Sequence, residues 1–252
     1  MDFTVLTLFP ELMDIFFNHG MISRGIEKKL IRGTIVNIRD FTSDRHKTVD
    51  DKPYGGGSGM VMKPEVLQAA VLHTKKKNPG CKVILMSPQG NKFNQEKAQE
   101  YAAGCKGLIF VCGRYEGIDE RVYTNHIDEE ISIGDYVMTG GEVASMVIID
   151  STTRLIPGVL GSKESYKSDS FTNDRLEYAH YTRPEAFENL NVPKILLSGN
   201  HEKIRQWRKK SSLQRTFLKR PDLLEKNRLD EEEKRIIKEW AKELEILMGS
   251  NC

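Results

Sequence analysis

The sequence predicts an α/β protein with a mostly parallel sheet, followed by a small helical C-terminal domain. Three observations support this fold class. Strand-like and helix-like segments alternate through roughly the first 160 residues. Several strand-like segments are short and almost wholly apolar, as expected for strands covered on both faces. From residue 201 onward the apolar spacing is mainly helical.

The alternating segments can be placed in order along the chain. Strands are expected at 3–9, 34–41, 82–86, 108–112 and 130–133. Helices are expected at 11–17, 64–77, 95–103 and 141–154. The last of these helices is rich in apolar residues, so we expect it to be largely buried. Asn78-Pro79-Gly80 is a clear stop after the second helix.

The pattern changes after residue 161. Residues 162–175 are polar and lack periodicity, which is typical of a mobile linker. Residues 176–252 are mostly helical by pattern, and 231–248 reads as an amphipathic helix with apolar residues at core spacing. We therefore expect an α/β domain at 1–161, a linker at 162–175 and a helical domain at 176–252.

The charge of the chain is unevenly distributed. The net charge is only +2, but residues 201–221 carry eight Lys and Arg against the single Glu202. A local basic stripe is expected where a protein meets a polyanion. A solvated helix face would have the same composition, so charge alone leaves both interpretations open.

Cysteine and histidine usage argues against several classes of protein. The four cysteines form no CxxC pair, and Cys81 and Cys112 lie in or beside apolar strands, as small buried thiols do. The six histidines are scattered, so we expect no zinc site or other metal cluster of this kind. No apolar run is long enough to span a bilayer, and a reducing cytoplasm is the expected compartment.

Three consecutive predicted strands end in glycine-bearing loops: 87–90, 112–117 and 133–141. Ligands of open α/β sheets bind beyond the carboxyl ends of the strands. Glycine permits the close backbone approach that a flat heterocycle needs, although most turns of this kind also contain one. The first strand lacks GxGxxG, and the glycines at 55–59 lack the Lys of a P-loop, which argues against a dinucleotide site and a P-loop. The loops suit an adenosine-like ligand, but their spacing does not identify it.

Several motifs make the sequence resemble one known family. CGRYEGIDERV (112–122), ISIGDYVMTGGE (131–142), RLIPGVLG (154–161), SDSF (168–171) and HYTRP (180–184) are similar to motifs of the bacterial tRNA (guanine-37-N1)-methyltransferases, as are KPYGGGSGMVMKPE (52–65) and SPQG (87–90). The motifs run in order from the first strand to the basic region. One departure is Val143-Ala144, where the family pattern has Leu-Pro.

The resemblance implies a SPOUT-class fold, in which the C-terminal part of the sheet is threaded into a deep trefoil knot, a rare exception to unknotted connectivity. It also implies a homodimer with shared active sites, and leaves magnesium open as a second cofactor. S-adenosylmethionine would be bound by the three loops. The implied donor-binding residues are Ser87, Pro88, Gly113, Tyr115, Ile133, Gly134, Asp135, Tyr136, Val137, Met138, Gly140 and Gly141.

The resemblance also assigns roles to charged residues. Guanine N1 carries a proton at neutral pH, so its methylation benefits from a general base. Asp169 would be that base and Arg154 its charge-stabilising partner, although a linker acid is usually just solvated. Glu116 would lie near the guanine or magnesium, whereas Asp119, which also follows a ligand-binding strand, fits an N-cap better.

Contacts with tRNA are expected on the far side of the linker. Glu177 is a weaker assignment, as a contact to the target base. The expected phosphate contacts are Lys203, Arg205, Arg208, Lys209, Lys210 and Arg215. Trp207 could stack on a base, but a core position is the more frequent role of tryptophan. The rival functions are a knotted methyltransferase for ribosomal RNA or a ribose hydroxyl, and a non-catalytic RNA-binding module.

Overall fold

The computed structural model describes residues 1–160, 169–226 and 228–249. The chain divides into two compact units, Met1–Lys163 and Glu164–Cys252, each described below by itself. Most of the segment expected to be a linker, from 162 to 168, lies outside the described residues.

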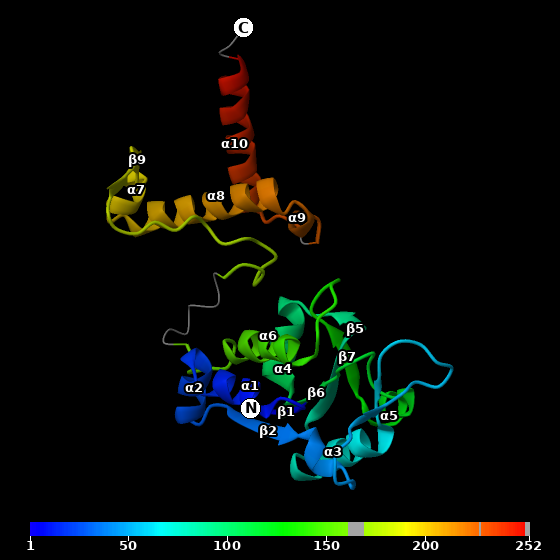
Figure 1. Cartoon of the computed structure of the whole chain (residues 1–252). Helices are drawn as coiled ribbons and strands as arrows, with labels where there is room; N and C mark the ends of the chain where they lie inside the picture. Colours follow the sequence, from blue (N-terminus) through cyan, green and yellow to red (C-terminus); the bar gives the residue numbers. More distant parts are fainter. Residues whose placement is uncertain (161–168, 227, 250–252) are drawn as a thin grey trace. The chain divides into compact units, whose positions relative to one another are not determined.

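The N-terminal unit is built on a five-stranded parallel sheet in the order β2-β1-β6-β5-β7 (Figure 1). Its strands are β1 (Asp2–Thr7), β2 (Arg32–Asn37), β5 (Lys82–Lys92), β6 (Gly107–Cys112) and β7 (Glu129–Ser132). The short strands β3 (Asp50–Asp51) and β4 (Val61–Met62) pair separately and antiparallel. The prediction of an α/β protein with a mostly parallel sheet is confirmed.

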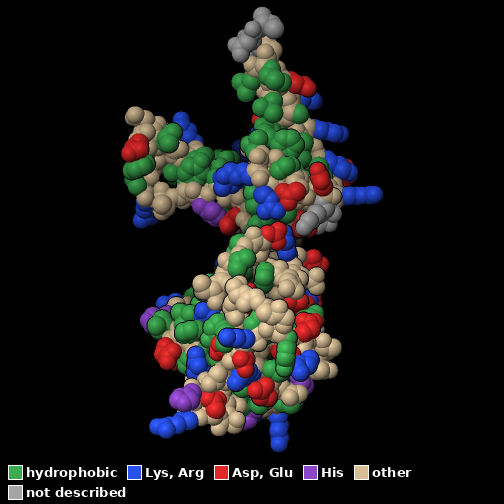
Figure 2. All heavy atoms as spheres, turned by 45° about the vertical axis from the view of Figure 1, so that its right-hand side comes forward, with side chains coloured by type: hydrophobic (Ala, Val, Ile, Leu, Met, Phe, Trp, Pro, Cys, Tyr) green, Lys and Arg blue, Asp and Glu red, His purple; other side chains and the backbone are tan. Residues whose placement is uncertain are grey.

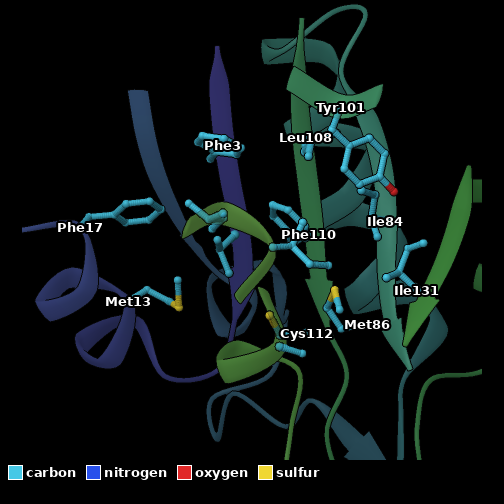
Figure 3. Close-up of a cluster of buried hydrophobic side chains, with 14 of the residues drawn as sticks. Phe3, Met13, Phe17, Ile84, Met86, Tyr101, Leu108, Phe110, Cys112 and Ile131 are labelled. Carbon is cyan, nitrogen blue, oxygen red and sulfur yellow. The ribbon is translucent and has the colours of Figure 1, made fainter. Parts of the chain in front are cut away.

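Helices cover both faces of this sheet, as expected for parallel strands. One face carries α1 (Pro10–Phe17), α2 (Gly20–Glu27), α4 (Gln95–Gly104) and α6 (Glu142–Thr153), and the other carries α3 (Pro64–Lys77) and α5 (Glu120–His126). Each face of the sheet has its own hydrophobic core: the first core lies under α1, α2, α4 and α6, and the second under α3 and α5. In β6, Phe110 and Cys112 belong to the first core, whereas Ile109 and Val111 belong to the second. Figure 3 shows the first core, where side chains of β1, β5 and β6 meet those of α1.

The structure corrects two local predictions and refines a third. The segment at 34–41 is not one strand, because the Asn37 side chain accepts a hydrogen bond from the Arg39 N–H and begins the 3-10 helix η1 (Ile38–Phe41). Strand β5 does not end at Met86 but continues to Lys92, with a register shift between Met86 and Asn91. Helix α6 is largely buried, as expected, but two of its apolar residues are not: Val143 and Val147 are 52% and 41% exposed.

The C-terminal unit is mostly helical (Figure 1). Its elements are β8 (Ala186–Phe187), β9 (Leu190–Asn191), α7 (Lys194–Leu197), α8 (His201–Lys219), α9 (Asp222–Lys226) and α10 (Glu231–Gly249). Helix α10, expected at 231–248, packs on α8 through the buried Ile236 and an edge-to-face contact between Trp240 and Phe217, with ring centroids 5.6 Å apart. The β8–β9 hairpin was not predicted. Within the described residues, no helix has the length and apolarity needed to cross a bilayer.

Candidate functional site

A cavity of about 460 Å³ opens beside the register shift of β5 and the carboxyl ends of β6 and β7, at the edge of the sheet where the glycine-bearing segments predicted a ligand site. Its walls come from three segments that are separate in the sequence: 85–89, 113–118 and 130–141. Helices contribute Glu120 and Tyr123 of α5 and Ala144 of α6. This volume falls within the usual range for a site that takes a small organic ligand.

Eleven of the twelve predicted donor-binding residues line this cavity. They are Ser87, Pro88, Gly113, Tyr115, Ile133, Gly134, Tyr136, Val137, Met138, Gly140 and Gly141. Asp135 does not line it, because its carboxylate bonds the Lys92 ammonium at 2.5 Å on the exposed side of the loop. The Tyr115 and Tyr136 rings are both about half exposed, so flat apolar surface is available beside the backbone groups.

Backbone contacts join the loop after β6 to the loop after β7. The Gly141 N–H donates to the Gly113 carbonyl at 3.2 Å, and Arg114 forms an isolated antiparallel bridge with Gly140. A Cβ at Gly141 would lie 2.8 Å from the Cα of Cys112, a backbone atom that cannot move aside. Glycine is therefore required at this crossing for steric reasons.

An ion pair that was not predicted lies behind these loops. Glu142 in the first turn of α6 is 1% exposed, and its carboxylate is 2.8 Å from the Arg114 guanidinium. The same carboxylate accepts a hydrogen bond of 2.6 Å from the Thr7 hydroxyl at the end of β1. Arg114 also donates to the Thr139 carbonyl at 3.0 Å and lies over the Phe9 ring, with 4.2 Å to its centroid. The sequence signal was weak, since an acid in the first turn of a helix is common.

Glu116 lines the cavity, whereas Asp119 does not. The Glu116 N–H donates to the Met60 carbonyl at 3.0 Å, and the Glu116 side chain lies against Gly59. The end of the glycine-rich segment at 55–59 therefore packs against the loop after β6. Asp119 is the N-cap of α5, as its alternative interpretation predicted: its carboxylate accepts from the Arg121 N–H. The Arg121 side chain, which bonds this carboxylate, lowers the pKa of Asp119.

Arg154 lies at the far end of α6 from the cavity. It is the C-cap of a helix whose first residue, Glu142, adjoins the glycine loops. Twelve helical residues separate the two ends by about 18 Å. The Arg154 side chain is exposed, and it does not line the cavity of its own chain.

The remaining predicted site residues belong to the C-terminal unit. Asp169 begins a turn at the start of its described part. Glu177 lies 2.9 Å from the His180 imidazole, whose ring contacts that of Tyr178 at 4.6 Å. The roles expected for Asp169 and Glu177 stay predictions.

Half of the predicted phosphate contacts are already paired with acids of the same unit. Arg205 bonds Glu202 and Glu232. Lys209 bonds Asp230 and Glu232, and Lys210 bonds Glu243 on α10. Figure 2 shows this mixture of blue and red side chains on the C-terminal unit.

The other basic residues of α8 differ among themselves. Lys203 and Arg208 are exposed, and the Arg208 guanidinium lies 4.9 Å from the centroid of the Tyr178 ring. The Arg215 side chain is half-buried, and its Nε is enclosed. Trp207 is also half-buried, with its ring 6.2 Å from that of Tyr181.

Among the residues that the structure describes, no three His, Cys, Asp or Glu side chains are grouped so that they could hold a metal ion. The cavity instead offers backbone N–H and carbonyl groups, glycines and three tyrosines, Tyr115, Tyr123 and Tyr136. A parallel α/β sheet with such a cavity at its carboxyl edge defines an α/β protein with a binding site for a small organic ligand.

Comparison with known proteins narrows this class. The family described as tRNA (Guanine-1)-methyltransferase TrmD matches residues 1–226. A protein of Clostridium botulinum strain Hall, named tRNA (guanine-N(1)-)-methyltransferase, is 54% identical over 244 residues, which cover 97% of this chain and 100% of that protein. Proteins of the same name from Desulfatibacillum aliphaticivorans and Dictyoglomus turgidum are 50% and 52% identical, over 97% and 95% of this chain and 93% and 96% of their own lengths. The chain therefore belongs to the tRNA (guanine-1)-methyltransferase family, a family of enzymes.

Proposed function

We propose that this enzyme transfers a methyl group from S-adenosylmethionine to N1 of guanine 37, the nucleotide 3′ to the anticodon in tRNA. The cavity formed by the three glycine loops is the observation that carries the proposal, together with membership of the family. The match to the tRNA (guanine-1)-methyltransferase family covers the whole N-terminal unit.

The cavity residues fit S-adenosylmethionine. Glycine at 140 and 141 lets this loop pack closely against Arg114 and Cys112, which shapes the cavity wall, and the lining residues at 133–138 offer backbone groups to a ligand. Tyr115 and Tyr136 add flat apolar surface at the rim. When bound, the donor supplies an electrophilic methyl group: the bond from guanine N1 to this carbon forms as its bond to sulfur breaks.

Asp169 serves as the general base in this proposal. Its carboxylate accepts the N1 proton. Without this step, the methylated guanine would carry a positive charge. Arg154 stabilises the negative charge that develops on the purine O6 or holds Asp169 in place. Glu116, a carboxylate of the cavity wall, lies where it could orient the guanine or hold a magnesium ion.

The position of Arg154 favours a homodimer with shared active sites. Arg154 is at the wrong end of α6 to act on the cavity of its own chain, and Val143 and Val147 form an exposed apolar stripe on the same helix. Packing this stripe against a second copy would bury it and bring Arg154 of one copy toward the cavity of the other. The knotted SPOUT threading of the sheet is part of the same proposal and rests on family membership.

The C-terminal unit docks the tRNA in this proposal. Lys203 and Arg208 are exposed cations of α8 that suit phosphate groups, with Trp207 as a surface for an unpaired base. Arg205, Lys209 and Lys210 contribute less, because each already has a carboxylate partner.

Methyl incorporation into unmodified tRNA tests the function directly. We expect incorporation into tRNA with guanine at position 37, none with adenine there, and 1-methylguanine as the product nucleoside. Donor binding by calorimetry should survive Asp169→Ala, while turnover is lost. A 2′-O-methylated product, or an Asp169→Ala enzyme with normal turnover, would overturn the proposal.

Mixing two inactive variants tests the shared site. Gly141→Ala impairs donor binding, so that it is inactive at a donor concentration far below its dissociation constant, and Asp169→Ala removes the base. If each site combines the cavity of one copy with the base of the other, random dimers recover about one quarter of the sites. If both parts come from one copy, the mixture stays inactive.

A further inference from the structure

The turn that carries Asp169 is closed by its own backbone. The Phe171 N–H donates to the Arg175 carbonyl at 2.8 Å, and the Thr172 N–H donates to the Asp169 carbonyl at 3.3 Å. Phe171 and Asp174 have φ angles of 72° and 51°. Such angles are unfavourable for residues other than glycine, so the surrounding contacts must maintain the turn. We call residues 169–175 the Asp169 turn.

Arg175 provides the main contact at the end of this turn. Its Nε and Nη2 each donate to the Glu233 carboxylate at 3.1 Å, a two-pronged pair between the turn and the start of α10. Both side chains are nearly nine-tenths buried, at 11% and 12% exposed. Arg175 Nη1 also donates to the Asp174 carbonyl at 2.9 Å, which fixes the guanidinium to the turn itself.

Glu233 is in turn held by the first residues of α10. The Glu233 N–H donates to the Asp230 carboxylate at 2.7 Å, and the Asp230 N–H donates to the Glu233 carboxylate at 2.9 Å. This reciprocal arrangement is a capping box, which fixes the side chain at the third position of a helix. The carboxylate that receives Arg175 is therefore held by contacts within α10 that do not depend on the turn.

Two hydroxyl groups of α8 hold the chain on the other side of Arg175. The Leu176 N–H donates to the Thr216 hydroxyl at 2.9 Å, and the Ser212 hydroxyl donates to the Leu176 carbonyl at 2.5 Å. The Ser170 hydroxyl accepts from the Glu177 N–H at 3.0 Å, which ties the residue after Asp169 to the same stretch. The Asp169 turn is thus built into the C-terminal unit.

We propose that Arg175, held by Glu233, is a positioning residue for the reaction: the pair places the Asp169 carboxylate for proton transfer from guanine N1. The inference rests on the proposed role of Asp169 as the base. It gives α10 a part in catalysis, because the first turn of this helix fixes the turn that carries the base. Arg175 touches neither donor nor guanine in this account and acts only through Asp169.

Single-turnover methylation at saturating tRNA and donor tests the role of the pair. Arg175→Gln should lower the rate roughly 10- to 100-fold, as expected when a catalytic group is misplaced by about 1 Å. Donor and tRNA dissociation constants should change less than about twofold. Arg175→Lys should recover part of the rate, because its ammonium can make one of the two bonds to Glu233.

The double variant Arg175→Gln with Glu233→Gln guards against a folding defect. It leaves no uncompensated buried charge, and Gln at the third helix position preserves the capping box. Its rate should fall as in Arg175→Gln while the circular dichroism spectrum stays that of the wild type. Glu243→Gln is the matched control, since it breaks the link from α10 to Lys210 without touching the turn. Its single-turnover rate should be unchanged.

Two further readouts separate positioning from a merely structural role. In an Asp169→Asn background, Arg175→Gln should have no additional effect, because both changes remove one function. The rate deficit of Arg175→Gln should also shrink as the pH approaches the pKa of guanine N1, where the base is no longer needed. Full additivity, or an equal deficit at every pH, would overturn the inference.

The two proposals fail in different ways. If Asp169→Asn retains the wild-type rate, the proposed base is wrong and the inference falls with it. If Asp169→Asn is inactive but the folded double variant is as fast as the wild type, the base stands and only the positioning role of Arg175 is wrong.

Discussion

Arg114 and Glu142 form an ion pair of 2.8 Å between the loop after β6 and the first turn of α6. The carboxylate is buried, and the hydroxyl of Thr7 satisfies its other oxygen at 2.6 Å. Because a helix N-terminus carries partial positive charge, α6 adds a further favourable interaction. One carboxylate therefore connects the ends of two strands to the helix that closes the cavity.

Glu142→Gln should destabilise the N-terminal unit. The change leaves the partly buried Arg114 without its counter-charge, and we expect a loss of about 1–3 kcal/mol in the free energy of unfolding. Urea denaturation measures it. Glu96→Gln is the control, since Glu96 is also an acid in the first turn of a helix but is exposed. Equal effects of the two changes would mean that the helix dipole alone accounts for the stabilisation by Glu142.

Gly141→Ala should weaken donor binding. The added Cβ would meet the Cα of Cys112 at 2.8 Å, so the loop must shift. Overpacking of this kind costs ~1–3 kcal/mol, which corresponds to roughly a ten- to hundredfold loss of affinity when it falls on the bound conformation. Isothermal calorimetry with S-adenosylmethionine gives the value. Gly104→Ala meets nothing within 4 Å and should bind the donor normally.

The Glu129 carboxylate should make stability depend on pH in acid. Burial alone raises the pKa of this group, but hydrogen bonds from Lys97, Lys82 and Tyr101 outweigh it, and the net shift is downward. A lowered folded-state pKa stabilises the protein above the unfolded-state pKa, and this stabilisation is lost as the pH falls through the folded-state value. Thermal melts between neutral pH and pH of about 3 should show a smaller acid-induced fall for Glu129→Gln than for the wild type. Parallel curves would contradict the assignment.

The affinity for tRNA should depend on salt through the exposed cations of α8. Each phosphate contact contributes about 1 to the slope of log affinity against log salt, so Lys203→Gln should reduce the slope by about that amount. Lys209→Gln should reduce it less, because the Lys209 ammonium lies 3.0 Å from Asp230 and 2.6 Å from Glu232. Filter binding at several salt concentrations compares the two. A larger effect of Lys209→Gln would reverse our ranking of these contacts.

The sequence was informative wherever local pattern decides the structure. The runs at 82–86 and 108–112 are the mostly buried parts of β5 and β6, and the glycine-bearing segments after them meet at one cavity because they lie at the same edge of a parallel sheet. The single exception among the predicted cavity residues, Asp135, points away because Lys92 offers it a partner across the neighbouring strand.

Features that depend on distant partners could not be predicted. The ion pair of Glu142 joins residues 28 positions apart, and its hydrogen bond reaches Thr7, 135 positions away. Lys210 looked like a phosphate contact, but its carboxylate partner Glu243 is 33 positions further along the chain. The exposed stripe of α6 was missed for a different reason: Val143 and Val147 have the same apolarity whether they face the sheet or a second copy.

The strand order has a consequence for synthesis of the chain on the ribosome. Strand β1 can pair with β2 early, but its other neighbour, β6, is completed only at Cys112, and β5 gains its outer neighbour only when β7 is completed at Ser132. Contacts of such long sequence separation form slowly, since a large loop must close first. A nascent chain that ends before Ser132 therefore exposes the edge of β5 that β7 later covers. The donor can contribute to folding only after more than half of the protein has emerged.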